Sequence, residues 1–200
     1  MPKTAAILVG GQARRFGGLD KSRLVVGGRT ILARQIAALD TVADRIILVG
    51  TAERPPEWPD LDVWADLRPG CGSLGGVYTA LKAGAAPVLV VACDLPFLTS
   101  AFLAFLFDAL GDRDAVVPRT EDGLHPTCGV WAPACVEPIG RRLDSGRLKV
   151  AEALAGLRVR EVGPREIEPF DPDGLLLMNL NTPEDLSRAV ARAGASGASP

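Results

Sequence analysis

Histidine is almost absent from this chain of 200 residues, which contains one, and aromatic residues make up only 5% of it. A metal site built from cysteine and histidine is therefore not indicated. The four cysteines include no CxxC pair, which argues against a zinc ribbon and a thioredoxin-like site. They are Cys71, Cys93, Cys128 and Cys135. We expect reduced, mostly buried thiols in a cytoplasmic protein.

Long hydrophobic runs and a strong charge of either sign are also missing. No apolar run approaches the roughly 18 residues that cross a bilayer. The run Ala5–Val9 is short and precedes Arg14 and Arg15, whereas targeting signals place positive charge first, so we expect a buried strand there. The net charge of −2 does not indicate a protein that coats nucleic acid or membranes. We therefore expect neither as a partner.

Short apolar runs alternate with helix-like segments along the chain. Strands covered on both faces are predicted at Thr4–Val9, Arg45–Val49, Val88–Cys93 and Leu175–Met178, and weaker strands at Leu61–Ala65, Ala115–Pro118, Cys128–Trp131 and Arg158–Val162. Helices are predicted at Ile31–Leu39 after Thr30, Leu74–Ala83 after Ser73, and Ala101–Leu110 after Thr99 and Ser100. This order predicts a doubly wound α/β sheet, with a hairpin or antiparallel strand within Glu121–Trp131.

The domain organisation is expected to be simple. We predict one domain over residues 1–193, large enough to bury a core without disulfides. The small residues of 194–200 predict a disordered tail, because they cannot bury enough surface to offset the entropy of ordering them.

A glycine-rich, basic loop follows the first predicted strand. It reads Gly10-Gly11-Gln12-Ala13-Arg14-Arg15-Phe16-Gly17-Gly18-Leu19-Asp20-Lys21. Glycines allow consecutive amides to face one anion, and Arg15 and Lys21 supply charge for a polyphosphate. The spacing matches neither GxxxxGK[ST] nor GxGxxG. A solvated surface turn is the alternative, but four glycines, two arginines and a lysine after a buried strand favour phosphate binding.

Two carboxylates follow other predicted strands. Asp94 comes directly after Val88–Cys93, where ligands of α/β sheets gather, and could hold Mg2+ or simply form a turn or helix cap. Asp66 follows Leu61–Ala65 and precedes the glycine-rich stretch Gly70–Gly76. That stretch could accept an anion at a helix N-terminus or could be tightly packed.

Amides and a histidine complete the set of candidate residues. Asn179 and Asn181 precede Thr182-Pro183-Glu184-Asp185, a strong helix start that requires neither asparagine. The single histidine, His125, is interpreted as a residue of a turn rather than as a catalyst.

These segments, in this order, resemble the molybdenum cofactor guanylyltransferases, the MobA family. The resemblance rests on Leu8–Lys21, Asp66, Gly72–Gly76, Cys93–Phe97, His125-Pro126 and Asn179–Asp185. It implies a Rossmann-like three-layer α/β/α domain with a mostly parallel sheet, similar to nucleotide-diphospho-sugar transferases. It also implies Mg2+-dependent transfer of GMP from GTP to molybdopterin, with release of pyrophosphate, and transient contact with molybdenum-cofactor synthesis or insertion proteins.

The resemblance also assigns roles to individual residues. It implies that Leu8, Gly10, Gly11 and Asp66 lie toward the nucleoside, that Arg15, Gly18 and Lys21 surround the triphosphate, that Asp94 ligates Mg2+, and that Asn179 and Asn181, with Arg147 and Lys149, lie toward the pterin. One departure is Gly50-Thr51-Ala52, where the family often has an asparagine near the nucleoside.

Three other functions compete with this interpretation. They are cytidylyl transfer to molybdopterin, nucleotidyl transfer to a sugar phosphate, and nucleotide binding without turnover. Gly10-Gly11 favours guanine, because the cytidine relatives usually have Ala-Gly there. The carboxylates and the basic loop argue against a protein that only binds nucleotides.

Overall fold

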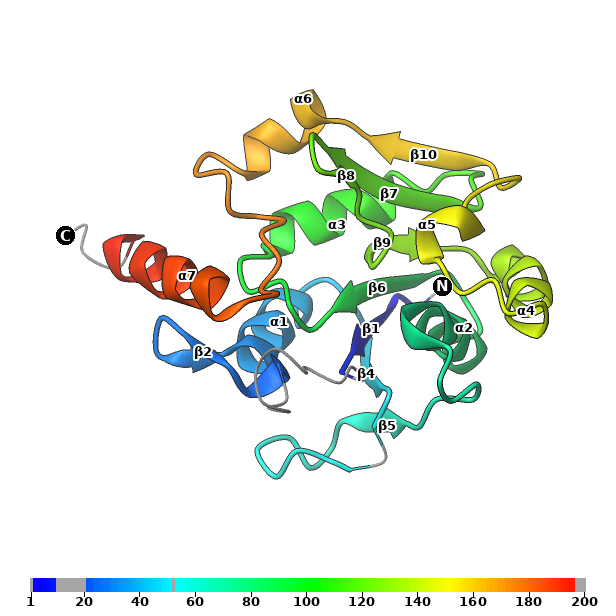
Figure 1. The fold of residues 1–200 in the computed structure, drawn as a ribbon, viewed down its shortest axis with the longest axis horizontal. Helices are drawn as coiled ribbons and strands as arrows, with labels where there is room; N and C mark the ends of the chain where they lie inside the picture. The colour runs from blue at the N-terminus through cyan, green and yellow to red at the C-terminus, as the bar shows by residue number, and fades with distance from the viewer. Residues whose placement is uncertain (1, 10–20, 52, 197–200) are drawn as a thin grey trace.

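The computed structural model describes residues 2–9, 21–51 and 53–196. An eight-stranded sheet forms its centre, with strand order β10-β7-β9-β6-β1-β4-β5 and with β8 paired to β7. Figure 1 shows this sheet from β10 at the top to β5 at the bottom. The strands are β1 (Thr4–Leu8), β4 (Arg45–Val49), β5 (Asp62–Trp64), β6 (Val88–Ala92), β7 (Ala115–Thr120), β8 (Gly123–Leu124), β9 (Cys128–Trp131) and β10 (Val159–Val162), and β2 (Val25–Val26) and β3 (Arg29–Thr30) form a separate hairpin.

Most of the strand pairs in the sheet are parallel. Strand β1 is parallel to β4 and β6, β4 is parallel to β5, and β10 is parallel to β7. Strand β9 is antiparallel to both β6 and β7, and β8 is antiparallel to β7. The predicted mostly parallel sheet is confirmed. The prediction of a hairpin or antiparallel strand within Glu121–Trp131 is also confirmed, since the antiparallel strand β9 lies there and β8 forms a hairpin with β7.

Helices cover both faces of the sheet, which gives three layers. The helical segments are α1 (Ile31–Leu39), α2 (Gly72–Gly84), α3 (Ser100–Asp108), α4 (Val136–Asp144), α5 (Val150–Ala153), α6 (Pro164–Ile167) and α7 (Pro183–Ser196), with 3-10 turns η2 (Lys21–Arg23), η3 (Pro133–Cys135) and η4 (Glu168–Phe170). In Figure 1, α2, α4 and α5 lie to the right of the sheet and α1, α3 and α7 to its left.

The strand β1 shows why its run is continuously apolar. All five of its residues are buried. Ala5 and Ile7 pack in the core beneath α1 and α3, whereas Ala6 and Leu8 pack in the core beneath α2 and α4. Because alternate side chains of a strand point to opposite faces, a strand covered on both faces needs apolar residues at every position.

Two predicted helix starts are confirmed and one is wrong. The hydroxyl oxygens of Thr30 and Thr99 accept hydrogen bonds from the amides of Ala33 and Phe102, as N-cap residues do. Helix α2 begins at Gly72, with Cys71 at its N-cap and without a side-chain cap bond. Ser73 is therefore inside the helix and does not cap it.

The strand predicted at Leu175–Met178 is absent, because these residues form a turn. The carboxylate of Asp171 accepts hydrogen bonds from the amides of Leu175 and Leu176 at 2.7 and 3.0 Å, and the amide of Met178 donates to the carbonyl of Leu175. These bonds satisfy locally the groups that a strand would pair with a neighbour. Leu176 and Leu177 are nevertheless buried, and Leu175 and Met178 are partly buried, which explains why the run resembled a strand.

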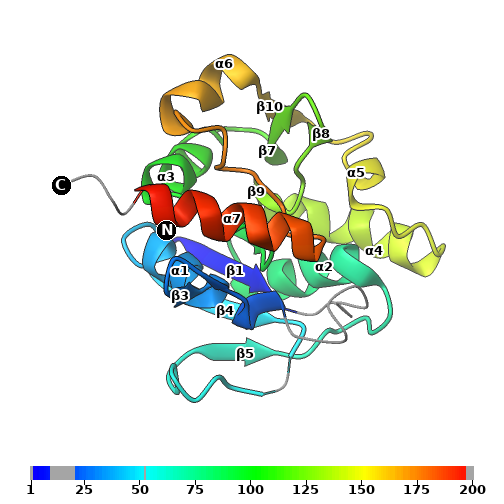
Figure 2. The same ribbon diagram turned by 60° about the vertical axis from the view of Figure 1, so that its left-hand side comes forward.

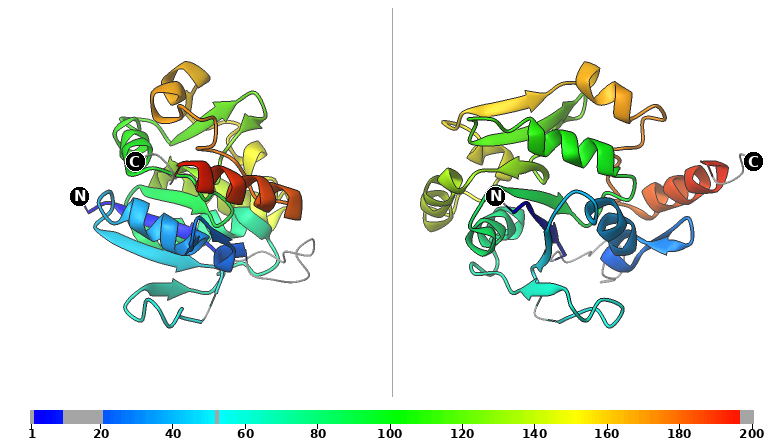
Figure 3. Two further views of the ribbon diagram at one scale, coloured as in Figure 1. Left: turned by 90° about the vertical axis from the view of Figure 1, so that its left-hand side faces the viewer. Right: turned by 180° about the vertical axis from the view of Figure 1, so that it is seen from behind.

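Helix α7 packs on the β2–β3 hairpin at one side of the molecule. Leu180 and Ala189 form a small core with Val26 and Ile31. Figure 2 shows α7 crossing in front of the central strands, and Figure 3 shows it from the side and from behind. The helix extends to Ser196, past the predicted domain boundary at residue 193, and residues 197–200 lie outside the described part of the chain.

The four cysteines lie in the described part of the chain, and no disulfide joins them. Burial raises the pKa of Cys128 and of Cys135 to about 12, so these two thiols stay protonated near neutral pH. Within the described ranges, none of the helices combines the length and the apolar character that a membrane crossing needs.

Close packing between β9 and β7 makes a prediction about Gly129. A Cβ atom added there would lie 2.5 Å from the carbonyl oxygen of Val116, a backbone atom in the middle of the sheet. We expect Gly129→Ala to lower the free energy of unfolding by about 3 kcal/mol, measured by chemical denaturation. Gly194→Ala in α7, where an added Cβ would have no described atom from beyond its own stretch of helix within 4 Å, is the control and should keep or slightly raise stability. Equal stability of the two variants would contradict the close approach.

Candidate active site

The candidate site lies at the carboxyl ends of the parallel strands. The residues predicted there are spread over the segments that follow β1, β5 and β6 and over the segment before α7. Gly10, Gly11, Arg15 and Gly18, which follow β1, lie outside the described residues, as does Ala52 after β4. The described candidates from these segments are therefore Leu8, Lys21, Asp66, Asp94 and the two asparagines.

Three of the candidates meet at one point. The Nζ atom of Lys21 lies 3.3 Å from Oδ2 of Asp94 and donates to Oδ1 of Asn181 at 2.9 Å. The side chains of Lys21 and Asp94 are only 19% and 20% exposed. A charged pair so far from solvent interacts more strongly than a surface pair, and the amide oxygen satisfies a further donor of the ammonium group.

The loop that carries Asp94 is held from below by a buried side chain. Gln35 of α1, which is 1% exposed, donates from Nε2 to the carbonyl oxygens of Ala92 and Leu95 at 2.7 and 3.1 Å. The amide of Leu180 donates to the carbonyl of Asp94 at 2.9 Å. Sequence reasoning missed Gln35, although a glutamine on the apolar face of a predicted helix is a signal for a buried polar contact.

The carboxylate of Asp94 has an unused oxygen. Its Oδ1 atom is buried and has no hydrogen-bond partner among the residues that the structure describes. A buried carboxylate oxygen at the end of a strand is a suitable ligand for Mg2+, which prefers oxygen and takes one or two carboxylates beside substrate phosphates. The described residues contain no group of three or more His, Cys, Asp or Glu side chains that could hold a metal by themselves. The residues present therefore match a cation that shares its ligands with a nucleotide.

Asp66 belongs to a different part of the site. Its Oδ1 atom is buried without a hydrogen-bond partner in the described part of the chain, and burial raises the pKa of its carboxyl group. It follows β5, which lies three strands away from β6, about 14 Å at the usual strand spacing. The neighbouring loop is fixed by Thr79, whose Oγ1 accepts from the amide of Leu67 at 3.0 Å. Thr79, a second buried polar residue, was not found from the sequence.

Tight packing explains two glycines in the first turns of α2, Gly75 and Gly76, whereas Gly70 and Gly72 have a positive φ and open space around them in the described part of the chain. A Cβ atom at Gly75 would lie 3.0 Å from the carbonyl oxygen of Arg68, and one at Gly76 would lie 3.2 Å from the side chain of Leu8. Leu8 itself is only 7% exposed, so its side chain belongs to the core. The packing alternative considered for this glycine-rich stretch is therefore observed.

The start of α7 positions Asn181. The carboxylate of Asp185 accepts from the amides of Asn181 and Thr182, both at 2.9 Å, and Thr182 Oγ1 accepts from the amide of Asp185. The backbone bond from Asn181, followed by the bond from Arg188, lowers the pKa of Asp185 to about 2. The predicted helix start is confirmed, and it also holds Asn181 beside Lys21.

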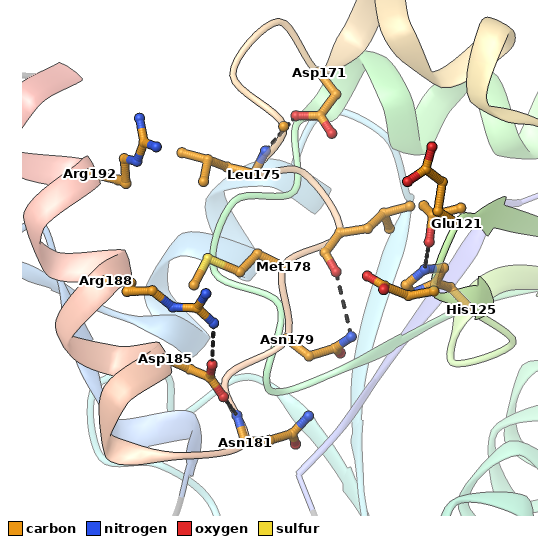
Figure 4. Close-up of a pocket in the computed structure, with 14 residues that line it drawn as sticks. Glu121, His125, Asp171, Leu175, Met178, Asn179, Asn181, Asp185, Arg188 and Arg192 are labelled. Atoms are coloured by element: carbon orange, nitrogen blue, oxygen red, sulfur yellow. Dashed lines mark hydrogen bonds and ion pairs between the residues drawn. The ribbon is translucent and has the colours of Figure 1, made fainter.

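A cavity of about 650 Å³ opens beside Asn181. Figure 4 shows its walls: α7 on one side, the turn at the end of β7 on the other, and the segment before α7 between them. The lining residues are Thr120, Glu121, Asp122, His125, Asp171, Gly174, Leu175, Leu177, Met178, Asn179, Asn181, Asp185, Arg188 and Arg192. Asn179 and Asn181 therefore line the same cavity.

The other candidates for the pterin side lie elsewhere. Between α4 and α5, Nε of Arg147 donates to Oγ of Ser145 at 3.1 Å. At the start of α5, Nζ of Lys149 lies 3.3 Å from Oε1 of Glu152. Neither lines the cavity that contains Asn179. His125 does line it, with Nε2 2.8 Å from Thr120 Oγ1, in agreement with a histidine fixed by its neighbours in the hairpin.

Comparison with known proteins identifies relatives along most of the chain. The family model described as "MobA-like NTP transferase domain" matches residues 5–159. A molybdenum cofactor guanylyltransferase of Desulfosudis oleivorans is 34% identical, with 94% of each chain covered. The protein of the same name from Cereibacter sphaeroides is 30% identical, with 92% of this chain and 93% of its own covered.

Solved structures agree with these relatives. A molybdopterin-guanine dinucleotide biosynthesis protein A from Archaeoglobus fulgidus is 26% identical, has a TM-score of 0.83, and is matched over 96% of this chain and 99% of its own. A 2-C-methyl-D-erythritol 4-phosphate cytidylyltransferase from Thermus thermophilus is 21% identical, with a TM-score of 0.73 over 97% and 100%, and shares the fold. The fold is therefore that of the nucleotide-diphospho-sugar transferases, and the chain belongs to the MobA-like NTP transferase family.

Proposed function

We propose that this protein transfers GMP from GTP to the phosphate of molybdopterin and releases pyrophosphate. The observation that carries the proposal is the meeting of Lys21, Asp94 and Asn181 at the carboxyl end of the sheet. It occurs in a chain whose relatives are named molybdenum cofactor guanylyltransferases, which favours GTP over CTP and molybdopterin over a sugar phosphate. Because GTP is a cytoplasmic metabolite, the proposal includes a cytoplasmic location and transient contact with proteins that make or insert the cofactor.

The proposed nucleotide site spans the loops after β1, β5 and β6. Gly10 and Gly11, beside Leu8, lie toward the nucleoside, where the half-buried carboxyl group of Asp66 can accept hydrogen bonds from the base or the ribose. The separation between β5 and β6 suits a ligand with its nucleoside near Asp66 and its phosphates near Asp94.

The proposed phosphate contacts are basic and come from the loop after β1. Arg15, Gly18 and Lys21 surround the triphosphate. Lys21 is paired with Asp94, so its ammonium group lies beside the carboxylate that is proposed to hold Mg2+. It needs only to exchange a carboxylate oxygen for a phosphate oxygen, and both are anionic acceptors of charge-assisted hydrogen bonds.

Charge neutralisation is the main requirement of the reaction. The acceptor phosphate and the triphosphate are both anionic and repel each other until basic groups compensate them. Mg2+, held by Asp94, would supply positive charge and polarise the phosphate oxygens. Lys21 and Arg15 would add charge and hold the α-phosphorus in line with the attacking oxygen.

The bond changes need no strong general base. An oxygen of the acceptor phosphate forms a bond to the α-phosphorus, and the bond from that phosphorus to the bridging oxygen of pyrophosphate breaks. The attacking oxygen is already ionised near neutral pH, so no proton has to be removed. The scarcity of histidine in the chain is therefore compatible with the proposed reaction.

A nucleotide panel tests the proposal directly. We expect pyrophosphate release from GTP, in the presence of Mg2+ and molybdopterin, to exceed release from ATP, CTP and UTP by at least about tenfold, because specific contacts to a base discriminate by one or more factors of ten. Preference for CTP would support cytidylyl transfer instead. Nucleotide binding without pyrophosphate release from any mixture would indicate a protein that only binds nucleotides.

The metal assignment predicts the effect of Asp94→Asn. The amide keeps the shape of the side chain but removes the charge that attracts Mg2+, so kcat/KM should fall by about 10²-fold or more. Asp108→Asn, at an exposed ion pair with Lys3, is the control and should keep its activity. Circular dichroism should show both variants folded. A folded Asp94→Asn protein with near-normal turnover would refute the assignment.

The position of Lys21 predicts different effects of its removal on the binding of GTP and on the binding of a divalent cation. Lys21→Met removes a phosphate contact, so the Kd for GTP should rise by about tenfold. It also removes a cation that competes for Asp94, so Mn2+ binding to the nucleotide-free protein, followed by electron paramagnetic resonance, should stay equal or become tighter. Lys82→Met on the surface of α2 is the control. Unchanged GTP affinity would contradict the phosphate role of Lys21.

A further inference from the structure

The cavity beside Asn181 has the size and position of a second substrate site. Its volume of about 650 Å³ is in the range of small-molecule pockets, about 300–1,000 Å³. Asn181 lines the cavity and also accepts a hydrogen bond from Lys21. The Nζ atom of Lys21 in turn lies 3.3 Å from Oδ2 of Asp94. A ligand in this cavity therefore touches the reaction centre at one end only.

The cavity walls differ in charge. Arg188 projects from α7 and is bound through Nη2 to Asp185, which uses one of the five N–H donors of its guanidinium group. On the opposite wall, Glu121 and Asp122 occupy the turn after β7. Figure 4 shows Arg188 and Glu121 on opposite sides of the segment that carries Asn179. The α7 wall therefore offers the remaining guanidinium donors of Arg188 beside the paired carboxylate of Asp185, and the opposite wall offers the carboxylates of Glu121 and Asp122.

His125, on the same wall as Glu121 and Asp122, does not add a positive charge that would offset their carboxylates. Its ring is half-buried, and burial lowers the pKa of the imidazole more than the charge of Asp122 raises it. The ring is therefore mostly neutral near pH 7, with Nε2 bonded to Thr120. Between the two walls, Leu177 and Met178 supply apolar surface and a thioether, which pack well against a planar ring.

Resting on the proposed function, we propose that molybdopterin occupies this cavity in one orientation, with its phosphate at Asn181, its anionic side chain along Arg188, and its amino-pyrimidinone edge against Glu121. The amino and ring N–H groups of that edge are donors with the spacing that a carboxylate accepts. The dithiolene is anionic and suits the guanidinium group of Arg188, and the phosphate at Asn181 lies beside the ammonium group of Lys21. The acceptor enters between α7 and the β7–β8 hairpin, away from the β5 side assigned to the nucleoside.

Two charge-removing variants test this orientation. Glu121→Gln and Arg188→Gln should each raise the Kd for molybdopterin about tenfold in anaerobic titrations, since each loses a charge-assisted hydrogen bond. The Kd for GTP should stay within about twofold of that of the unmodified protein. Glu137→Gln and Arg141→Gln, an exposed pair on α4, make the same changes of charge away from the cavity and should leave both affinities unchanged.

The outcomes separate this proposal from the proposed function. The orientation is wrong if either cavity variant binds molybdopterin as tightly as the unmodified protein, or if both substrates are lost equally. Because Arg188 also pairs with Asp185 at the start of α7, Arg188→Lys is added, and its melting temperature is compared with that of Arg188→Gln. Recovery of molybdopterin affinity in Arg188→Lys supports a role of the charge. Absence of GMP transfer by the unmodified protein would contradict the proposed function itself, whatever the variants bind.

Discussion

The contact of the Lys21 ammonium group with Asp94 and Asn181 is the interaction on which the site depends. It joins three parts of the chain: the segment after β1, the loop after β6 and the start of α7. Neither charge could be buried to this extent alone without a large loss of solvation free energy, so each requires the other. The pair therefore helps to hold the C-terminal segment against the sheet.

Two further side chains around this contact keep it in place. Gln35 binds the carbonyls of Ala92 and Leu95 from beneath, and Asp185 binds the amide of Asn181 from α7. Both supports act on the backbone and so leave the functional side chains available to ligands. Positioning of this kind matters for transfer between two anions, because small displacements of the reacting groups slow such reactions strongly.

The division of the site follows from the topology of the sheet. Parallel strands bring Asp66 and Asp94 to the same edge, and the two strands between β5 and β6 separate them. The antiparallel strand β9 carries the chain back beside β6 and places the β7–β8 hairpin on the other side of Asp94. A nucleotide on the β5 side and an acceptor on the hairpin side would thus approach Asp94 from opposite directions.

The sequence by itself determined the elements whose causes are local. Continuous apolar runs predicted β1, β4 and β6, Thr30 and Thr99 predicted the starts of α1 and α3, and carboxylates after strands indicated Asp66 and Asp94 as candidates. Periodicity could not distinguish a strand from the turn at Leu175–Met178, because burial makes both apolar and the bonds from Asp171 decide between them. Only the tertiary structure decided that Lys21 meets Asp94 and that Asn179 shares a cavity with Arg188 and Glu121. These contacts depend on the order of strands in the sheet and on the packing of α7, which bring together residues far apart along the chain.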